Sequence, residues 1–176
     1  TFAIPKELKE LVDADRMMIL EIRGNNHQTV FPPSVHPSGG KIAWHDDPTT
    51  LPTMEAAELI SLCGIIAFLT VVAIFYPKVA GERDEVCMMI AGVLVRAGLS
   101  DDVIDELIES VASLGGDEEA EKRRGKAAAT RARMDAGEGV WGLPELCSRM
   151  GLEAAETTFR KWLGSKAQAN HGDTSG

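Results

Sequence analysis

The sequence has few cysteines and lacks a secretion signal. Its three cysteines lie far apart and form no CxxC pair. An odd number of isolated cysteines argues against a disulfide framework and against a zinc site. The chain begins at Thr1 instead of methionine, and no leader of basic residues followed by an apolar run precedes the first predicted strand. These features predict a processed or excised fragment in a reducing cytoplasm, not a secreted precursor.

An excess of positive charge is also lacking. The formal net charge is −9 at pH 7. Because a protein that coats nucleic acid needs concentrated Lys and Arg, this balance argues against such a role and leaves only local basic patches open. A site for a divalent metal would itself contribute carboxylates, so an acidic chain is compatible with a nucleotide enzyme.

The first 50 residues carry the β pattern. Residues 17–22 and 28–31 are short apolar or alternating runs, and Gly24-Asn25-Asn26 between them favours a tight reversal, so we expect a hairpin. Pro32-Pro33 removes two backbone donors. The chain should therefore leave the ladder there and continue as a loop to a third extended piece at 41–44.

From Thr53 onward the spacing of apolar residues becomes helical. Capping residues, glycines and prolines bound predicted helices at 53–76, 82–97, 101–114, 117–136, 144–150 and 153–163. We expect a mainly α fold with a small β portion, a bundle of about five to seven helices carrying a short antiparallel sheet remnant at its N-terminal end. The expected division is a β part at 1–50, a helical bundle at 53–164 and a disordered tail at 165–176.

The first predicted helix raises the question of a membrane span. Residues 59–76 carry no charged side chain, and this run is long enough to cross a bilayer. Ser61, Gly64 and Thr70 interrupt it, no aromatic belt lies at its amino end, and acidic helices follow. We therefore expect a buried central helix and no membrane partner. A membrane-anchored regulator, which would need detergent, is a third alternative.

Glu21 is the first candidate for chemistry. It lies between Leu20 and Ile22 on a predicted strand, where an unpaired carboxylate would be costly. Pairing with Arg23 or a lysine at the sheet surface is one interpretation. The other is a ligand for Mg²⁺ or Mn²⁺, which take oxygen ligands and bridge to substrate phosphates.

The loop PPSVHPSGG is the second candidate. The hydroxyls of Ser34 and Ser38, the ring of His36 and the glycine amides can all donate to phosphate oxygens or a sugar hydroxyl. By itself, a proline-stiffened loop of this composition is typical of a structural turn. It contains neither the GxxxxGK[ST] nor the GxGxxG phosphate-binding pattern.

Basic residues gather in the predicted helix 117–136. At about 100° per residue, Lys122, Lys126 and Arg133 fall on one face, which could contact a nucleic-acid backbone. Glu118 lies four residues before Lys122, in the orientation that favours an ion pair within the helix. A solvated, salt-bridged face is therefore the competing interpretation.

Three segments together resemble a known family, the bifunctional DNA primase/polymerases of phages, plasmids and prophages, within the archaeo-eukaryotic primase superfamily. EIRGNNHQTVFPPSVHPSGGKIAW resembles the end of their catalytic domain, where an acidic strand residue is followed by RG, a glycine-rich turn, a PPS-x-H-x-x-G loop and a Trp. GERDEVCMMIAGVLVRAGLSDDVIDELIESVASLGGDEEAEKR and GVWGLPELCSRMG resemble the helical domain that follows. The resemblance covers most of residues 17–164.

The resemblance implies roles for several residues. Glu21 corresponds to the third acidic motif, a catalytic metal ligand that acts with an upstream Asp-x-Asp/Glu pair and a histidine motif. Ser34 and His36 match a loop near the bound nucleotide. The parent would use Mg²⁺ or Mn²⁺, nucleotides and a single-stranded DNA template, with a helicase domain or subunit as partner. Neither upstream motif is in this sequence, so we expect the chain alone to be inactive and to bind no metal tightly.

The function expected first is therefore a piece of a DNA primase/polymerase, whose helical domain assists template or nucleotide binding through Lys122, Lys126 and Arg133. The competing interpretation is a helical interaction module without enzymatic activity. In that case the uncharged helix would pack against another subunit, and exposed apolar surface would drive formation of a homodimer.

Overall fold

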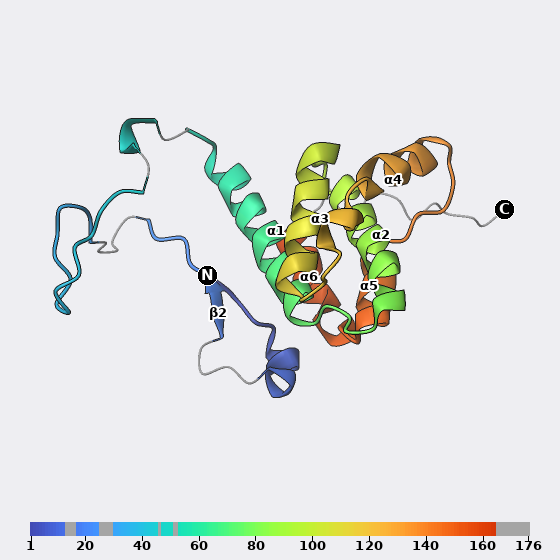
Figure 1. Cartoon of the computed structure of the whole chain (residues 1–176), viewed down its shortest axis with the longest axis horizontal. Coiled ribbons are helices and arrows are strands. Elements are labelled where there is room, and N and C mark those ends of the chain that lie inside the picture. Colours follow the sequence, from blue (N-terminus) through green and yellow to red (C-terminus); the bar gives the residue numbers. More distant parts are fainter. Residues whose placement is uncertain (13–16, 25–29, 46, 51–52, 165–176) are drawn as a thin grey trace.

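The structure is a computed structural model that describes residues 1–12, 17–24, 30–45, 47–50 and 53–164 (Figure 1). Its α-helices are α1 (Ala56–Ile74), α2 (Ala80–Arg96), α3 (Asp101–Leu114), α4 (Lys126–Asp135), α5 (Leu143–Met150) and α6 (Glu156–Leu163). Strands β1 (Phe2–Ala3) and β2 (Met18–Leu20) and the 3₁₀ helices η1 (Lys6–Leu11), η2 (Pro48–Thr50), η3 (Ala120–Arg123) and η4 (Glu153–Ala155) complete it. The predicted fold class, mainly α with a small β portion, is confirmed.

Glycines and capping residues end the helices close to where the sequence predicts. Gly98 and Gly116, just after α2 and α3, have φ of 87° and 82°. This left-handed conformation suits glycine and stops a helix. Ser100 is the N-cap of α3, and Asp101 and Asp102 occupy its first turn, where the helix dipole favours negative charge.

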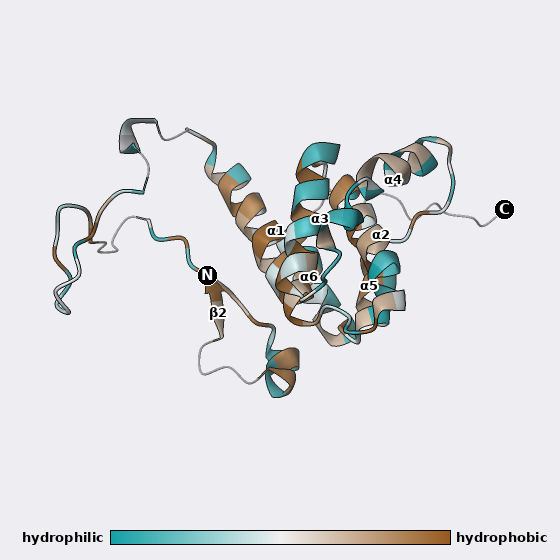
Figure 2. Cartoon of the chain, viewed as in Figure 1, coloured by the Kyte–Doolittle hydropathy of each residue, from teal (hydrophilic) through white to brown (hydrophobic). Residues whose placement is uncertain are grey.

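The core lies where α1, α2, α3 and α6 meet. In Figure 2 the ribbon of α1 is mostly brown, the colour of hydrophobic residues. Phe68 of α1 and Phe159 of α6 are fully buried. Their rings pack edge to face, with centroids 5.3 Å apart. Ile90 of α2 and Ile108 of α3 are also fully buried, so each helix contributes an apolar face to one shared core.

Helix α1 has two different parts. Most residues from Cys63 to Ala73 are buried, whereas 56–62 are exposed. By length and composition, Ala56–Ile74 is the one helix among the described residues that could cross a membrane, and 44% of its most apolar stretch is buried in the structure. The prediction of a buried central helix is therefore confirmed for the second half of α1 and wrong for its first two turns.

The small sheet differs from the predicted hairpin. Strand β2 pairs antiparallel with β1, placing Phe2 opposite Leu20. Val30 and Phe31 belong to no strand, and the predicted turn at 25–26 lies outside the described residues. The described residues therefore do not form the predicted pairing of 17–22 with 28–31. A two-residue strand such as β1 shows no alternation of apolar and polar positions, so the sequence gives no sign of it.

Residues 1–12 and 17–20 dock on the bundle through apolar contacts. Ile4 and Leu8 are buried, and the ring of Phe2 packs edge to face against Trp162 of α6 at 5.8 Å between centroids. Residues 30–45, by contrast, form a loop away from the bundle (Figure 1). An isolated bridge joins Val35 to Lys41, so the predicted extended piece at 41–44 is reduced to its first residue.

The predicted helix 117–136 is broken into η3 and α4. Arg124 is extended, with φ −64° and ψ 163°, and Gly125 is left-handed, with φ 84°. Asp105 of α3 accepts hydrogen bonds from the amides of Gly125 at 2.8 Å and Ala127 at 3.3 Å. A side chain from another helix thus satisfies amides at the start of α4, which favours a new helix start.

Two glycines allow close helix packing. A Cβ atom added to Gly92 of α2 would lie 2.0 Å from the carbonyl oxygen of Trp141, and one added to Gly64 of α1 would lie 2.1 Å from that of Trp162. Both contacts are with backbone, which cannot swing aside as a side chain can. These glycines therefore set how closely α2 approaches the loop before α5 and how closely α1 approaches α6.

Gly92→Ala should lower the free energy of unfolding by about 1–3 kcal/mol, the usual cost of overpacking. Gly81→Ala is a matched control in the same helix, because nothing lies within 4 Å of its added Cβ. The control should raise stability by about 0.5 kcal/mol, since alanine favours helix over glycine. Urea unfolding followed by circular dichroism measures both. Equal effects would contradict the packing described.

Candidate functional site

Glu21 lies immediately after β2 and forms an ion pair. Its Oε2 accepts a hydrogen bond from Nε of Arg23 at 2.7 Å. The Glu21 side chain is 26% exposed and that of Arg23 is 53% exposed. This is the pairing that the first interpretation of Glu21 predicted. Because the pair is partly exposed, it contributes little to the stability of the fold. Glu21 can therefore exchange Arg23 for another partner at low cost.

His36 lies on a turn that its own backbone holds. Its amide donates to the Gly40 carbonyl, and the Gly39 amide donates to the His36 carbonyl, each at 2.8 Å. The Ser38 amide donates to Nδ1 of His36 at 3.2 Å, and the Ser38 hydroxyl lies 2.8 Å from the same nitrogen. An accepting Nδ1 assigns the proton of the neutral ring to Nε2. Nε2 of the exposed His36 is then a donor.

Ser34 lies on the same loop. Its amide donates to the Phe31 carbonyl at 2.9 Å, and its carbonyl accepts from the Ile42 amide at 3.0 Å. The backbone of Ser34 is therefore fixed, and the residue is exposed. Ser34 and His36, which the sequence singles out, thus share one ordered loop.

Within the described ranges, no three His, Cys, Asp or Glu side chains are close enough together to hold a metal ion. Glu21 supplies one carboxylate. Nucleotidyl transfer by two metals needs several oxygen ligands around both ions. The described residues therefore do not form such a centre among themselves, and the assignment of Glu21 as a metal ligand stays a prediction.

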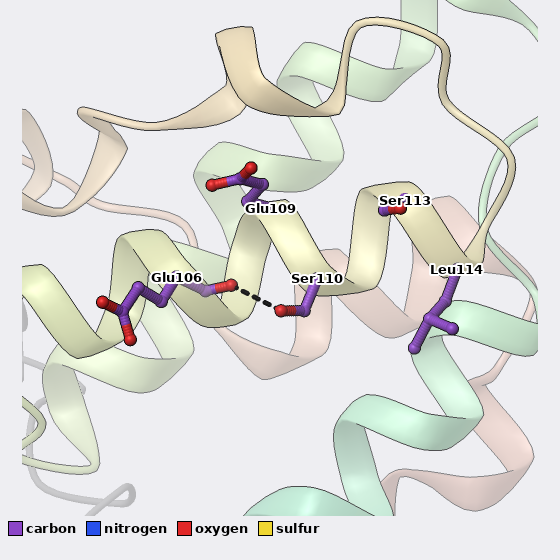
Figure 3. Close-up of a pocket in the computed structure, with 5 residues that line it drawn as sticks. All are labelled: Glu106, Glu109, Ser110, Ser113 and Leu114. Atoms are coloured by element: carbon purple, nitrogen blue, oxygen red, sulfur yellow. Dashed lines mark hydrogen bonds between the residues drawn. The ribbon is translucent and has the colours of Figure 1, made fainter.

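An open hollow lies on the outer side of α3 (Figure 3), lined by Glu106, Glu109, Ser110, Ser113 and Leu114. The Ser110 hydroxyl donates to the Glu106 carbonyl at 2.8 Å, and Glu109 forms an ion pair with Arg124 at 2.6 Å. These polar groups are thus engaged within the protein. Because ligand sites are usually enclosed and apolar with a few convergent polar groups, this hollow is a weak candidate.

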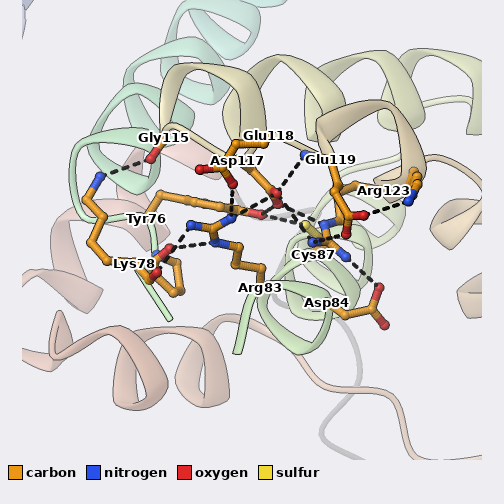
Figure 4. Close-up of polar contacts among 12 residues, drawn as sticks. Tyr76, Lys78, Arg83, Asp84, Cys87, Gly115, Asp117, Glu118, Glu119 and Arg123 are labelled. Atoms are coloured by element: carbon orange, nitrogen blue, oxygen red, sulfur yellow. Dashed lines mark hydrogen bonds and ion pairs between the residues drawn. The ribbon is translucent and has the colours of Figure 1, made fainter. Parts of the chain in front are cut away.

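A buried charged network surrounds Asp117 (Figure 4), whose side chain is fully buried. Its Oδ1 accepts from Nη1 of Arg83 at 3.1 Å, and its Oδ2 accepts from Nε of Arg123 at 2.8 Å. The Tyr76 hydroxyl donates to Oδ2, and the Glu119 amide donates to Oδ1, each at 3.1 Å. Asp117 thus joins the end of α1, the start of α2 and η3.

The electrostatics of this network favour the charged carboxylate. Burial raises the pKa of Asp117, but hydrogen bonds from Arg123, the Glu119 amide and Tyr76 outweigh it and lower the pKa to about 2. Burial and the neighbouring Cys87 raise the pKa of Tyr76, so its hydroxyl stays protonated and donates. In the described part of the chain, every buried side-chain nitrogen or oxygen has a hydrogen-bond partner. The network therefore acts as a structural clamp and offers no open group to a substrate.

The three residues of the predicted basic face lie on two elements instead of one helix. Lys122 lies on η3, whereas Lys126 and Arg133 lie on α4, beyond the break at Gly125. Each forms an ion pair with a carboxylate: Lys122 with Glu119 at 2.5 Å, Lys126 with Asp84 at 2.6 Å, and Arg133 with Glu138 at 3.1 Å. This agrees with a salt-bridged surface, although Glu118 pairs with Arg83 and not with Lys122.

Sequence reasoning missed the role of Asp117, which it took only as the start of the predicted helix 117–136. The Asp117 carboxylate accepts the Glu119 amide, but the N-cap of η3 is Glu119 itself. Its pairing with Arg83 joins residues far apart in the chain, and no local pattern signals such a contact. Comparisons with protein-family models, with curated proteins and with solved structures find no match to this chain.

Asp117→Asn should lower the free energy of unfolding at pH 7 by about 3 kcal/mol, because two buried guanidinium groups lose the buried carboxylate that they share and keep only more exposed partners, such as Glu118 and Asp84. The depressed pKa makes this stabilisation fully present above the ordinary aspartate pKa of 3.8, and it is lost as the pH falls through about 2. The stability advantage of the original chain should thus shrink by about 2 kcal/mol between pH 5 and pH 2.

Urea unfolding at several pH values measures this difference. Asp135→Asn is a matched control, because Asp135 is an exposed aspartate at the end of α4. It should change stability by less than about 0.5 kcal/mol. A difference between original chain and Asp117→Asn that is the same at every pH would show that the charge of Asp117 does not stabilise the fold.

Proposed function

We propose that this chain is the C-terminal part of a DNA primase/polymerase. The observation that carries the proposal is the order of Glu21, Arg23-Gly24, the loop of Ser34 and His36, and Trp44, which resembles the end of that catalytic domain. The geometry of the loop is compatible with it. Nε2 of His36 and the hydroxyl of Ser34 lie on an exposed loop whose turn is already fixed, so they could donate to a nucleotide phosphate without the loop unfolding.

Glu21 would act as one metal ligand of the complete enzyme. Mg²⁺ or Mn²⁺ would there bridge carboxylates to the phosphates of the incoming nucleotide and stabilise the charge that develops during nucleotidyl transfer. The contact between Glu21 and Arg23 is partly exposed, so a metal could replace the guanidinium at low cost. The upstream acidic pair and histidine motif of the parent would supply the remaining groups.

The helical bundle would support this element and the template. Strands β1 and β2 contact α1, and Phe2 packs against Trp162 of α6, so the bundle holds the strand that leads to Glu21. Lys122, Lys126 and Arg133 would contact the single-stranded template by exchanging their carboxylate partners for phosphates. Such an exchange is feasible at Lys122 and Arg133, whose side chains are 71% and 45% exposed.

In the complete coding region, the sequence upstream of Thr1 should encode Asp-x-Asp or Asp-x-Glu on a strand, then a strand with a histidine. The complete protein should extend a primer with Mg²⁺ or Mn²⁺. Glu21→Gln should slow this extension by more than about 100-fold, because losing even an outer-shell metal partner costs 10–100-fold. Glu7→Gln, a change at an exposed glutamate of η1, should leave the rate unchanged.

Primer extension with labelled nucleotides measures these rates, and chain 1–176 alone should be inactive. The proposal fails if the upstream sequence lacks the acidic pair. It also fails if the complete protein keeps its rate after Glu21→Gln.

Replacing Lys122, Lys126 and Arg133 together with alanine should weaken binding to a single-stranded oligonucleotide. The slope of log affinity against log salt should fall by about 2, because each lost phosphate contact contributes roughly 0.7. The double variant Glu119→Gln, Glu138→Gln should have the opposite effect. It removes the carboxylate partners of Lys122 and Arg133 and should therefore strengthen binding. Fluorescence anisotropy measures both. An unchanged salt slope in the alanine variant would remove these residues from the template site.

A further inference from the structure

Helix α1 carries an exposed apolar stripe along its whole length. Leu59, Leu62, Ile66 and Ile74 are 39%, 38%, 48% and 45% exposed. At about 100° per residue they lie on one side of the helix, with Thr70 between Ile66 and Ile74. We call these five residues the α1 stripe. The Thr70 hydroxyl donates to the Ile66 carbonyl at 2.8 Å, so its polar group is already satisfied within the helix.

From Cys63 to Ala73 most other positions of α1 are buried in the protein, whereas its first two turns are exposed. Helix α1 packs against α3, α6, β1 and β2. Leu114 of α3, which is 79% exposed, points toward the ribbon of α1 in Figure 3 and adds to the apolar surface. A contiguous exposed apolar surface of this kind on a folded protein marks an interaction site. From Cys63 onward the stripe is therefore the exposed side of α1, and in the first two turns Ile60, which is 54% exposed, adds to the apolar surface.

The charges at the two ends of the stripe are opposite. Glu55, the N-cap of α1, is exposed and lies four residues before Leu59. Lys78 lies beyond the end of α1 at Ile74, and its ammonium group donates to a neutral acceptor, the Gly115 carbonyl at the end of α3, at 2.9 Å. Ile66 is close to midway between Glu55 and Lys78 in the sequence. The stripe thus has an acidic end, an apolar centre and a basic end.

This arrangement is complementary to itself when reversed. We propose that α1 packs against α1 of a second copy, antiparallel, with the two-fold axis at Ile66. Leu59 then lies against Ile74 of the partner subunit, and Ile66 lies against Ile66 of the partner subunit. Glu55 meets Lys78 of the partner subunit at both ends. A two-fold interface requires such self-complementarity, and antiparallel helices also place opposite ends of their dipoles together.

A second copy fits this face better than a lipid surface. Helices that lie on membranes carry Lys and Arg beside their apolar face and are attracted to anionic lipid. The amino end of α1 instead carries Glu55 and Glu58, and the chain has a net charge of −9. These charges repel anionic lipid. The inference does not depend on the proposed nucleotide chemistry, because the dimer forms or fails whether or not the chain belongs to a polymerase.

Cysteine cross-linking tests the two-fold axis directly. The native cysteines are buried, so they will not form disulfides in place of the introduced cysteine. Under mild oxidation Ile66→Cys should convert most of the protein into a covalent dimer, because the two thiols meet at the axis. Val103→Cys is the matched control, since Val103 is 44% exposed on α3 and lies outside the stripe. It should stay monomeric on a non-reducing gel.

A charge exchange tests the orientation in solution. In sedimentation equilibrium, Glu55→Lys should raise the dissociation constant of the dimer by roughly tenfold, because two like-charged contacts replace two opposite ones. Adding Lys78→Glu to the same chain should restore the original value. Thermal unfolding by circular dichroism verifies that the variants fold.

Three results would overturn the proposal. The first is Ile66→Cys cross-linking no faster than Val103→Cys. The second is an original chain that stays monomeric at all concentrations reached in sedimentation. The third is binding of the original chain to vesicles of phosphatidylcholine and phosphatidylserine, together with loss of this binding in the Ile66→Asp variant. This outcome would assign the stripe to lipid.

Discussion

The buried carboxylate of Asp117 is the interaction on which the arrangement of the bundle depends. Burying a charge is costly unless it is paired and fully hydrogen-bonded, and Arg83, Arg123 and Tyr76 together meet that condition. The burial of apolar area has no direction, so it favours many relative positions of α1 and α2. The hydrogen bonds to Asp117 do have direction, and they fix the end of α1, the start of α2 and η3 relative to one another.

The same charges bear on how available the basic segment is to a ligand. Arg123 turns inward to Asp117, and Lys126 pairs with Asp84 of α2. Once these cations hold α2 against η3 and α4, they are less available to a ligand. The remaining candidates for phosphate contact are the more exposed cations, Lys122 and Arg133. A nucleic-acid phosphate would have to displace the carboxylates that already neutralise these two cations.

Local chemistry predicts much of the helical fold, and contacts between distant residues explain what it misses. Gly98 and Ser100 mark the end of α2 and the start of α3 because capping is decided by neighbouring residues. The break at Gly125 needs Asp105, a side chain from another helix, and the pairing of β2 needs the distant strand β1. For the candidate site, the sequence identifies Ser34 and His36 as one loop, and the structure adds the hydrogen bonds that order it.

The position of α1 connects the two proposals. Its inner face belongs to the core, its stripe is exposed, and residues 30–45 lie on the side of the molecule from which α1 begins (Figure 1). In the proposed dimer the amino end of α1 lies beside the carboxyl end of the partner's helix. Dimerisation would thus cover the apolar stripe and leave the inner face of α1 in the core of each copy.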